Sequence, residues 1–226
     1  MNSFYVTGTD TGIGKTVVSV ALLHALRARG LRAVGMKPVA SGCVQTAGGW
    51  HNDDALALLD ASDPRPDYAD LNPYALPLPL APELAARDAG VEIELATLVS
   101  AFHRLQATAD AVVVEGVGGW AAPLSASLDQ ADLVRSLRVP VVLVVGMRLG
   151  CISHARLTAR AIADDGCELV GWIANHVDPQ MERQDENFAM LEARMQAPCW
   201  GRLPYAEAMD AAWLSRALEF DWQALS

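Results

Sequence analysis

Lysine is scarce in this chain of 226 residues, which carries fifteen arginines but only two lysines, Lys15 and Lys37. A general preference for arginine would explain the scarcity, but it does not explain where the two lysines lie. Lys15 belongs to a glycine-rich turn, and Lys37 directly follows a short apolar segment. A planar guanidinium cannot replace a compact ammonium among phosphate oxygens or in a small polar pocket. We therefore predict that both lysines are active-site cations.

An excess of basic charge and long apolar runs are also absent. The net charge of −10 argues against a surface for nucleic acid or for an anionic membrane. No run approaches the roughly 18 apolar residues of a membrane span, and no basic segment followed by an apolar one opens the sequence. We expect a cytoplasmic protein with neither a nucleic-acid nor a membrane partner.

Cysteine occurs only four times, at separated positions that form no CxxC pair, so reduced thiols fit better than zinc or disulfides. The 52% hydrophobic content supplies a large core, and the 19% charged fraction argues against disorder. A chain of this length is expected to form a single domain over residues 1–226.

A glycine-rich stretch, GTDTGIGKT at residues 8–16, lies between a short apolar strand at residues 4–7 and an amphipathic helix from residue 16 to residue 29. The backbone N–H groups of such a turn and the N-terminus of the helix cradle phosphate, Lys15 adds positive charge, and the Thr16 hydroxyl can ligate Mg²⁺. The common pattern would place its first glycine at Thr9, whereas here Gly8 stands one residue earlier. We predict nucleotide binding.

Apolar, β-branched runs predict buried parallel strands at residues 111–114 and 139–145, further strands are expected at 31–36 and 169–174, and residues 200–205 are expected to form a last short strand and turn. Together with the phosphate loop they predict an α/β fold of the P-loop NTPase type: a mainly parallel β-sheet flanked by helices on both faces, in three layers. Right-handed crossovers bring the carboxyl ends of such strands to one edge, where ligands bind. Lys15 and Lys37 should converge there. The proline-rich segment 64–82 is expected to be irregular, and residues 211–225 are expected to form a helix with Trp213, Leu214, Leu218 and Trp222 in the core.

Acidic residues stand at two places near this edge. Asn52 or Asp53 could cap a helix, and Asp53 and Asp54 suit either the positive helix N-terminus or Mg²⁺, which residue chemistry alone does not decide. Glu115 ends a buried strand and precedes glycines that allow close approach of a ligand, as a metal-binding or water-positioning carboxylate does.

Residues 175–178 read NHVD and resemble the guanine-reading NKxD motif of GTPases, but His176 replaces its lysine and no DxxG switch accompanies it. GTP specificity is therefore disfavoured. A switch ATPase of the chromosome-partitioning type would carry an extra lysine early in the loop, which is absent here. A corrinoid amidase synthetase usually carries a glutaminase domain, for which the chain has no room.

Several segments together resemble the dethiobiotin synthetase family, in order and with the family's spacing from residue 4 to about residue 205. They are GTDTGIGKT at residues 8–16, MKPVASG at 36–42, NDDAL at 52–56, NPY at 72–74, VEGVGGW at 114–120, LGCISHA at 149–155 and GWIAN at 171–175. The GTDT variant of the phosphate loop accounts for the shifted glycine.

The resemblance implies an ATP-dependent carboxylase that closes a cyclic urea. The family joins 7,8-diaminononanoate, CO₂ and MgATP to give dethiobiotin, ADP and phosphate in biotin biosynthesis. One amine captures CO₂ as a carbamate, the γ-phosphoryl group of ATP transfers to it, and the neighbouring amine displaces phosphate. Family membership also implies a homodimer whose active site lies at the subunit interface.

The resemblance assigns roles to individual residues. Lys15 and Lys37 would be catalytic, and Thr16, Asp54 and Glu115 would hold Mg²⁺, with Asp53 as a capping neighbour. Thr11 and Ser41 would contact the diamine or its carbamate, and the helix start at Gly150, Cys151, Ile152 and Ser153 would receive the carboxylate of the partner's substrate. The nucleotide would contact Gly12, Ile13, Gly14, Lys15, Thr16, Val17, Asp54, Glu115, Gly116, Val117, Gly118, Asn175, His176, Pro204, Tyr205 and Ala206. Two positions depart from some relatives, which carry asparagine in place of Ser153 and glutamate in place of Gly12.

Overall fold

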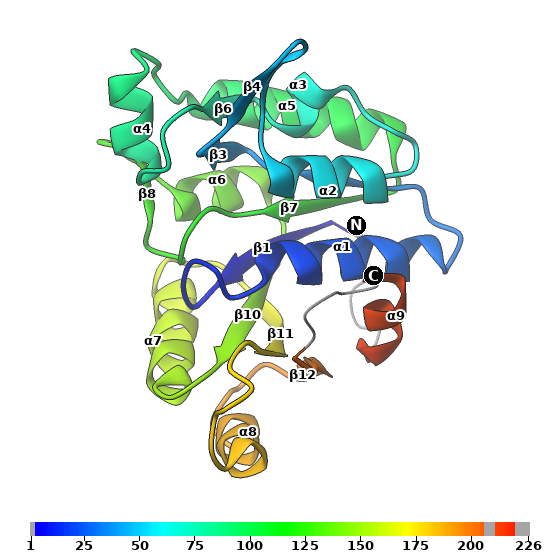
Figure 1. Cartoon of the computed structure of the whole chain (residues 1–226), viewed down its shortest axis with the longest axis vertical. Coiled ribbons are helices and arrows are strands. Elements are labelled where there is room, and N and C mark those ends of the chain that lie inside the picture. The colour runs from blue at the N-terminus through cyan, green and yellow to red at the C-terminus, as the bar shows by residue number, and fades with distance from the viewer. Residues whose placement is uncertain (1–2, 206–210, 220–226) are drawn as a thin grey trace.

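The computed structural model describes residues 3–205 and 211–219, which build a six-stranded sheet covered by helices on both faces (Figure 1). All neighbouring strands of this sheet pair in parallel, in the order β12-β11-β10-β1-β7-β2. Along the chain the strands are β1 (Phe4–Gly8), β2 (Ala33–Met36), β7 (Ala111–Glu115), β10 (Val141–Met147), β11 (Leu169–His176) and β12 (Cys199–Leu203). The predicted fold class is confirmed.

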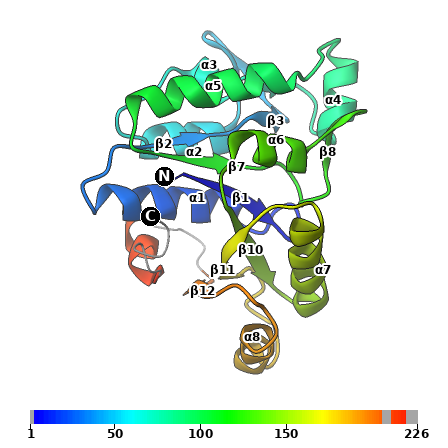
Figure 2. The same cartoon turned by 180° about the vertical axis from the view of Figure 1, so that it is seen from behind.

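The four strands β1, β2, β7 and β10 are buried at every residue, because their successive side chains enter opposite cores. Phe4, Val6 and Val113 face one core, which α1 (Lys15–Arg27), α2 (Asp53–Ala61) and Leu214 of α9 (Ala211–Leu214) cover. The helices that pack on the opposite face, seen from behind in Figure 2, are α4 (Pro82–Asp88), α5 (Leu95–Thr108), α6 (Gln130–Leu137) and α7 (Cys151–Asp164), and α8 (Gln184–Glu192) lies beyond α7. No helix in the described part of the chain has the length and apolar character needed to cross a lipid bilayer.

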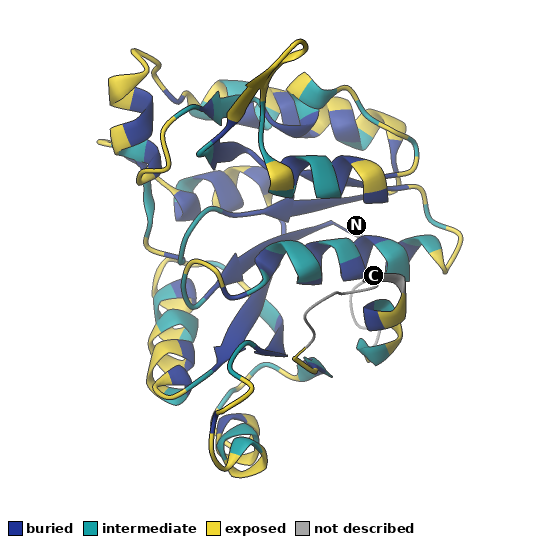
Figure 3. Ribbon diagram, viewed as in Figure 1, coloured by how far each residue is buried: buried dark blue, intermediate teal, exposed yellow. Residues whose placement is uncertain are grey.

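Three small two-stranded sheets lie outside the main sheet. β3 (Val39–Ser41) pairs in parallel with β6 (Tyr74–Leu76), and β8 (Pro123–Ser125) pairs with β9 (Leu128–Asp129). β4 (Val44–Thr46) and β5 (Gly49–His51) form an exposed antiparallel hairpin that projects at the top of Figures 1 and 3. The first of these sheets holds the segment that follows Lys37.

Two predictions about local structure were wrong. The proline-rich segment contains α3 (Tyr68–Leu71) and β6, because Pro73 and Pro77 flank this strand and no proline interrupts its pairing. At the other end of the chain, α9 passes into a 3₁₀ turn (Ser215–Ala217), and Leu218 bridges to Gly201 instead of continuing a helix. Trp213, expected in the core, is 50% exposed. Residues 220–225 of that predicted helix lie outside the described residues.

Candidate active site

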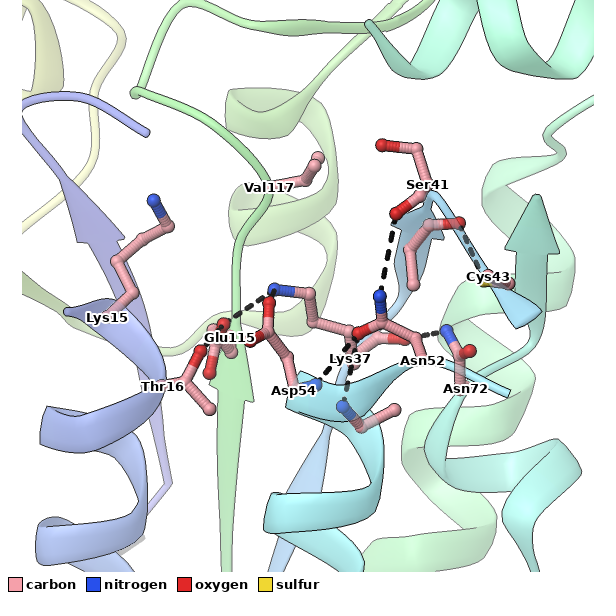
Figure 4. A network of polar contacts seen from close by, with 12 residues as sticks. Lys15, Thr16, Lys37, Ser41, Cys43, Asn52, Asp54, Asn72, Glu115 and Val117 are labelled. Atoms are coloured by element: carbon pink, nitrogen blue, oxygen red, sulfur yellow. Dashed lines mark hydrogen bonds and ion pairs between the residues drawn. The ribbon is translucent and has the colours of Figure 1, made fainter. Parts of the chain in front are cut away.

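A cavity of about 410 Å³ lies at the carboxyl edge of the sheet, between the phosphate loop and the segments after β2 and β7. Lys15 and Lys37 both line it, at the edge where the handedness of the crossovers predicts that they converge. Figure 4 shows the two lysines on either side of the strand that ends in Glu115. The residues around the cavity are Thr11, Gly12, Gly14, Lys15, Thr16, Val17, Lys37, Ala40, Ser41, Asn52, Asp54, Glu115, Val117 and Gly118.

The phosphate loop is a turn that needs glycine at its closing positions. Gly12 and Gly14 have φ angles of +70° and +84°, which side chains rarely tolerate, and Gly14 caps α1. Lys15 is only 7% exposed, and its Nζ donates to the backbone oxygen of Asp10 at 2.9 Å. Burial, and next the positive charge of Lys37, lower the pKa of Lys15 to about 8. The loop therefore holds a cation that no carboxylate in the described chain pairs at contact distance.

Lys37 lies in a different environment at almost the same depth, with 4% of the residue exposed. Its Nζ lies 2.5 Å from Oε1 of Glu115 and 3.0 Å from Oδ2 of Asp54. Burial lowers its pKa, but the charges of Glu115 and Asp54 outweigh burial and hold that pKa above its ordinary value. Its backbone is fixed as well, since the Asn72 side chain donates to its carbonyl oxygen at 2.7 Å. Lys37 is thus a permanently charged, rigidly held cation.

Three oxygen-bearing side chains meet between the two lysines. Thr16 Oγ1 donates to Glu115 Oε1 at 2.9 Å, and Asp54 approaches from the first turn of α2 (Figure 4). Burial raises the pKa of Asp54, but the charge and hydrogen bond of Lys37 outweigh it, so the net shift is downward and Asp54 is ionised. Oε2 of Glu115 is buried with no hydrogen-bond partner among the described residues.

This donor set fits a magnesium ion. A hydroxyl and two carboxylates are oxygen ligands of the kind that Mg²⁺ prefers, and the unpaired Oε2 of Glu115 is a buried acceptor that otherwise carries a desolvation penalty. In the described chain no group of three or more histidine, cysteine, aspartate or glutamate side chains could hold a metal ion, so the set here consists of two carboxylates and the Thr16 hydroxyl. Asn52, not Asp53, caps α2 by accepting from the N–H groups of Asp54 and Ala55, which corrects the assignment of Asp53 as the capping neighbour.

Two residues predicted to contact the nucleotide, Asn175 and His176, lie at the end of β11. Asn175 donates from Nδ2 to the carbonyl oxygen of Ile13 at 2.8 Å, so part of its amide braces the loop. Nε2 of His176 accepts from Nε of Arg202 at 2.8 Å. Burial, and next the charge of Arg202, lower the pKa of His176, so its ring is neutral at pH 7. Pro204 and Tyr205 are exposed after β12, and Ala206 lies outside the described residues.

The remaining predicted residues divide into those at the cavity and those beside it. Thr11, Ser41 and Val17 line it directly, whereas Ile13 packs beneath the loop and Gly116 lies against Tyr5. The segment from Gly150 to Ser153, which includes Cys151 and Ile152, begins α7 and does not line the cavity of the single chain. An ion pair of Arg148 with Asp10 ties the segment before α7 to the phosphate loop.

Comparisons with known proteins identify the family. A model of the AAA domain family matches residues 2–212. The chain is 69% identical to the ATP-dependent dethiobiotin synthetase BioD of Xanthomonas euvesicatoria pv. vesicatoria (strain 85-10), over 96% of this chain and 97% of that protein. It is 62% identical to the protein of the same name from Xylella fastidiosa (strain 9a5c), over 91% of each. The chain belongs to the ATP-dependent dethiobiotin synthetase family. Membership makes it an ATP-dependent ligase, and the predicted resemblance is confirmed.

The architecture of this dethiobiotin synthetase family member is similar to that of solved nucleotide-binding proteins. The MinC:MinD cell division protein complex of Aquifex aeolicus matches with a TM-score of 0.57 and 14% identity, over 95% of this chain and 86% of that one. A ParA family ATPase from Chlorobium tepidum TLS matches with a TM-score of 0.56 and 15% identity, over 95% and 88%. At these identities the likeness shows the P-loop NTPase fold alone.

Sequence patterns did not single out every residue at the synthetase cavity. Ala40 and Asn52 line it, and Asn72 holds the Lys37 backbone. Their signals are weak, because the sequence indicates Asn52 as a possible helix cap and as part of the NDDAL segment, and Asn72 only as part of the NPY segment. A hydrogen bond from a side chain to a distant carbonyl oxygen leaves no repeating pattern in the sequence, so it cannot be predicted from periodicity.

Proposed function

We propose that this chain joins 7,8-diaminononanoate, CO₂ and ATP to give dethiobiotin, ADP and phosphate, the penultimate step of biotin biosynthesis. One amine of the diamine attacks CO₂ and loses a proton to form a carbamate. A carbamate oxygen then attacks the γ-phosphorus of ATP, which releases ADP and leaves a carbamic–phosphoric anhydride. The second amine attacks the carbamate carbon, phosphate leaves, and the cyclic urea closes.

The observation that carries this proposal is the pair of buried lysines in one cavity of about 410 Å³. Carbamate and γ-phosphate are both anions, so bringing them into contact requires positive charge on each side. Lys15 and the loop N–H groups would bind the β- and γ-phosphates. Lys37 would bridge the carbamate and the γ-phosphate, where negative charge builds up in the transition state.

Thr16, Asp54 and Glu115 would hold Mg²⁺, and the unpaired Oε2 of Glu115 supports this assignment. When bound, the ion would neutralise phosphate charge and orient the γ-phosphoryl group. Asp54 also keeps Lys37 charged, since its Oδ2 lies 3.0 Å from Nζ. The same carboxylates therefore serve the metal and the catalytic cation.

The diamine would lie toward Thr11 and Ser41, both of which line the cavity. Its remote carboxylate would reach the start of α7 in a second subunit, where the N–H groups of Ile152 and Ser153 suit an anion. This arrangement requires a homodimer. Asn175, His176, Pro204, Tyr205 and Ala206 would surround the adenine, and the reaction would take place in the cytoplasm.

The decisive experiment is mass detection of dethiobiotin from purified protein, 7,8-diaminononanoate, bicarbonate and MgATP, with phosphate release followed in parallel. We expect both products to appear together and to require every component. Each component is omitted in turn as a control. Phosphate release that runs equally fast without the diamine would contradict the synthetase function.

A further inference from the structure

The turn after β7, residues 116–122, forms one wall of the active-site cavity and lies against the phosphate loop. Val117 and Gly118 line the cavity, and Figure 4 places Val117 between Lys15 and Ser41. A Cβ atom added to Gly119 would stand 3.6 Å from the carbonyl oxygen of Gly8. The turn therefore borders the place where phosphate and carbamate would meet.

One buried side chain, that of Gln130, holds this turn from behind. Its Oε1 accepts from the backbone N–H of Val117 at 3.1 Å and from the hydroxyl of Tyr5 at 2.6 Å. Its Nε2 lies within hydrogen-bonding distance of three carbonyl oxygens of the turn: Gly119 at 2.7 Å, Trp120 at 3.2 Å and Ala122 at 3.4 Å. Gln130 has no exposed surface, so both ends of its amide are used within the protein.

The position of Gln130 is itself rigid. It is the first residue of α6, whose start is fixed by a capping box between Asp129 and Asp132. Tyr5 belongs to the central strand β1, and burial, then the charge of Glu115, raise the pKa of Tyr5, so it stays a hydrogen-bond donor. A Cβ atom at Gly116 would lie 2.5 Å from Oε1 of Gln130 and 2.8 Å from the Tyr5 hydroxyl oxygen. The strand therefore leaves the sheet through a glycine that makes room for this amide.

We infer that Gln130, oriented by Tyr5, is a positioning residue that holds the 116–122 turn closed over the reacting groups and keeps water from the phosphorylated carbamate. The inference rests on the proposed function, because only an anhydride intermediate makes water exclusion matter. Gln130 touches neither substrate nor nucleotide in this assignment. It acts through Val117 and Gly118, whose placement it fixes by bonds to both ends of the turn.

The test is the Gln130→Met enzyme, in which the side chain keeps its length but loses its hydrogen bonds. Dethiobiotin and phosphate are measured together at saturating diamine, bicarbonate and MgATP. A loosened turn should lower kcat by about tenfold or more, as small misplacements of reacting groups do. It should also raise the ratio of phosphate released to dethiobiotin formed from one to about two or more, because water now competes for the anhydride.

The product ratio separates positioning from mere loss of stability, since a smaller folded fraction lowers both products equally. Ser62→Ala is the matched control: Ser62 is 8% exposed, accepts from Gly35 N–H and donates to the Leu58 carbonyl oxygen, away from the turn. It should lower the melting temperature and leave the ratio at one. Tyr5→Phe, which removes only one of the bonds to Gln130, should give an intermediate ratio.

Two outcomes remain distinct. If wild-type enzyme makes no dethiobiotin, the proposed function fails. If wild-type enzyme makes dethiobiotin while folded Gln130→Met enzyme keeps a ratio of one, the positioning role of Gln130 is wrong. Folding of the variant is checked by circular dichroism and by its melting temperature.

Discussion

The two lysines of the chain are buried to nearly the same depth, 7% exposed for Lys15 and 4% for Lys37, yet their surroundings are opposite. Lys37 contacts two carboxylates, and its pKa is raised. Lys15 contacts a single carbonyl oxygen, and its pKa is lowered to about 8. The two lysines are buried to a similar extent, so the opposite directions of their pKa shifts come from the carboxylates that contact Lys37 and not Lys15.

The difference shows at which end of the cavity the protein itself neutralises the lysine charge. We call this end, around Lys37, the complete half of the site. At the Lys37 end the protein supplies its own anions, so the cation is charged and fixed before any substrate arrives. At the Lys15 end the protein leaves a buried charge without a carboxylate in contact, which costs free energy until an anion binds. A polyphosphate is such an anion. The phosphate loop around Lys15 is therefore the half of the site whose charge stays uncompensated until an anion binds, and we call it the receptive half.

The largest expected effect comes from breaking the complete half. Lys37→Ala should lower kcat for ring closure by about 10²- to 10³-fold, because a charge aimed at the transition state is lost. ATP affinity should stay within about threefold, since the loop N–H groups and Lys15 remain. Dethiobiotin formation and nucleotide titration measure the two quantities. Unchanged turnover would remove Lys37 from the mechanism.

Lys37→Arg is the matched variant for the same experiment. It keeps the charge but replaces a compact ammonium by a planar guanidinium beside Glu115 and Asp54. We expect it to be nearly as inactive as Lys37→Ala. Recovery of wild-type rates would mean that charge alone suffices and that the pocket tolerates the larger group.

Breaking the receptive half should have a mixed result. Lys15→Met should weaken ATP binding by about 10- to 100-fold, the worth of a charge-assisted hydrogen bond to phosphate. The same variant should be more stable than wild type without nucleotide, by about 3 kcal/mol at pH 7, because a pKa of about 8 instead of 10.5 means that folding opposes the charge. Calorimetric titration and urea unfolding test the two halves of this prediction.

The sign of that stability difference depends on pH. Below pH 8 folded wild type carries the unfavourable charge, and between pH 8 and 10.5 the unfolded chain binds the extra proton, so wild-type stability rises with pH. The advantage of Lys15→Met should therefore shrink over that window. An advantage that grows with pH would show that Lys15 is not the destabilising group.

A smaller effect is expected at the carboxylate that joins the two halves. Asp54→Asn should raise the Mg²⁺ concentration needed for half-maximal activity by about tenfold, as the loss of one ordering contact at a metal site does. Its side chain is 45% exposed, so water can replace part of the interaction. Asp53→Asn is the control: it changes the neighbouring exposed carboxylate and should leave the Mg²⁺ requirement as it is. Equal shifts in both variants would indicate a general charge effect.

The fold and the site also differ in how much of them the sequence predicts. The strands and the convergence of Lys15 and Lys37 at one edge follow from apolar runs and from crossover handedness, which are local or topological properties. The helix and strand inside the proline-rich segment could not be predicted from local patterns, because the Asn72 side chain stabilises the segment by donating to the distant carbonyl oxygen of Lys37. The early end of the last helix depends on the contact of Leu218 with Gly201.

Individual side chains were predicted where their type is rare and missed where it is common. Two lysines in 226 residues stand out, and so does a glutamate at the end of a buried strand. A glutamine at the start of an amphipathic helix does not, although Gln130 is fully buried and bonded to the cavity wall. Asn52, which the sequence indicates as a possible helix cap and as part of the NDDAL segment, is both the cap of α2 and a cavity residue.

The smallest effect is a pH dependence of nucleotide binding confined to the receptive half. If ATP binds the charged form of Lys15, whose pKa is about 8, its apparent Kd should rise about fourfold between pH 7 and 8.5. Lys37, with its raised pKa, stays charged over this range, and neutral His176 does not titrate in it. Nucleotide titration at several pH values should give an apparent Kd that rises with pH in wild type and a Kd that does not change with pH in Lys15→Met. A Kd that still rises with pH in Lys15→Met would show that another group titrates, and the proposed electrostatic difference between Lys15 and Lys37 would then be wrong.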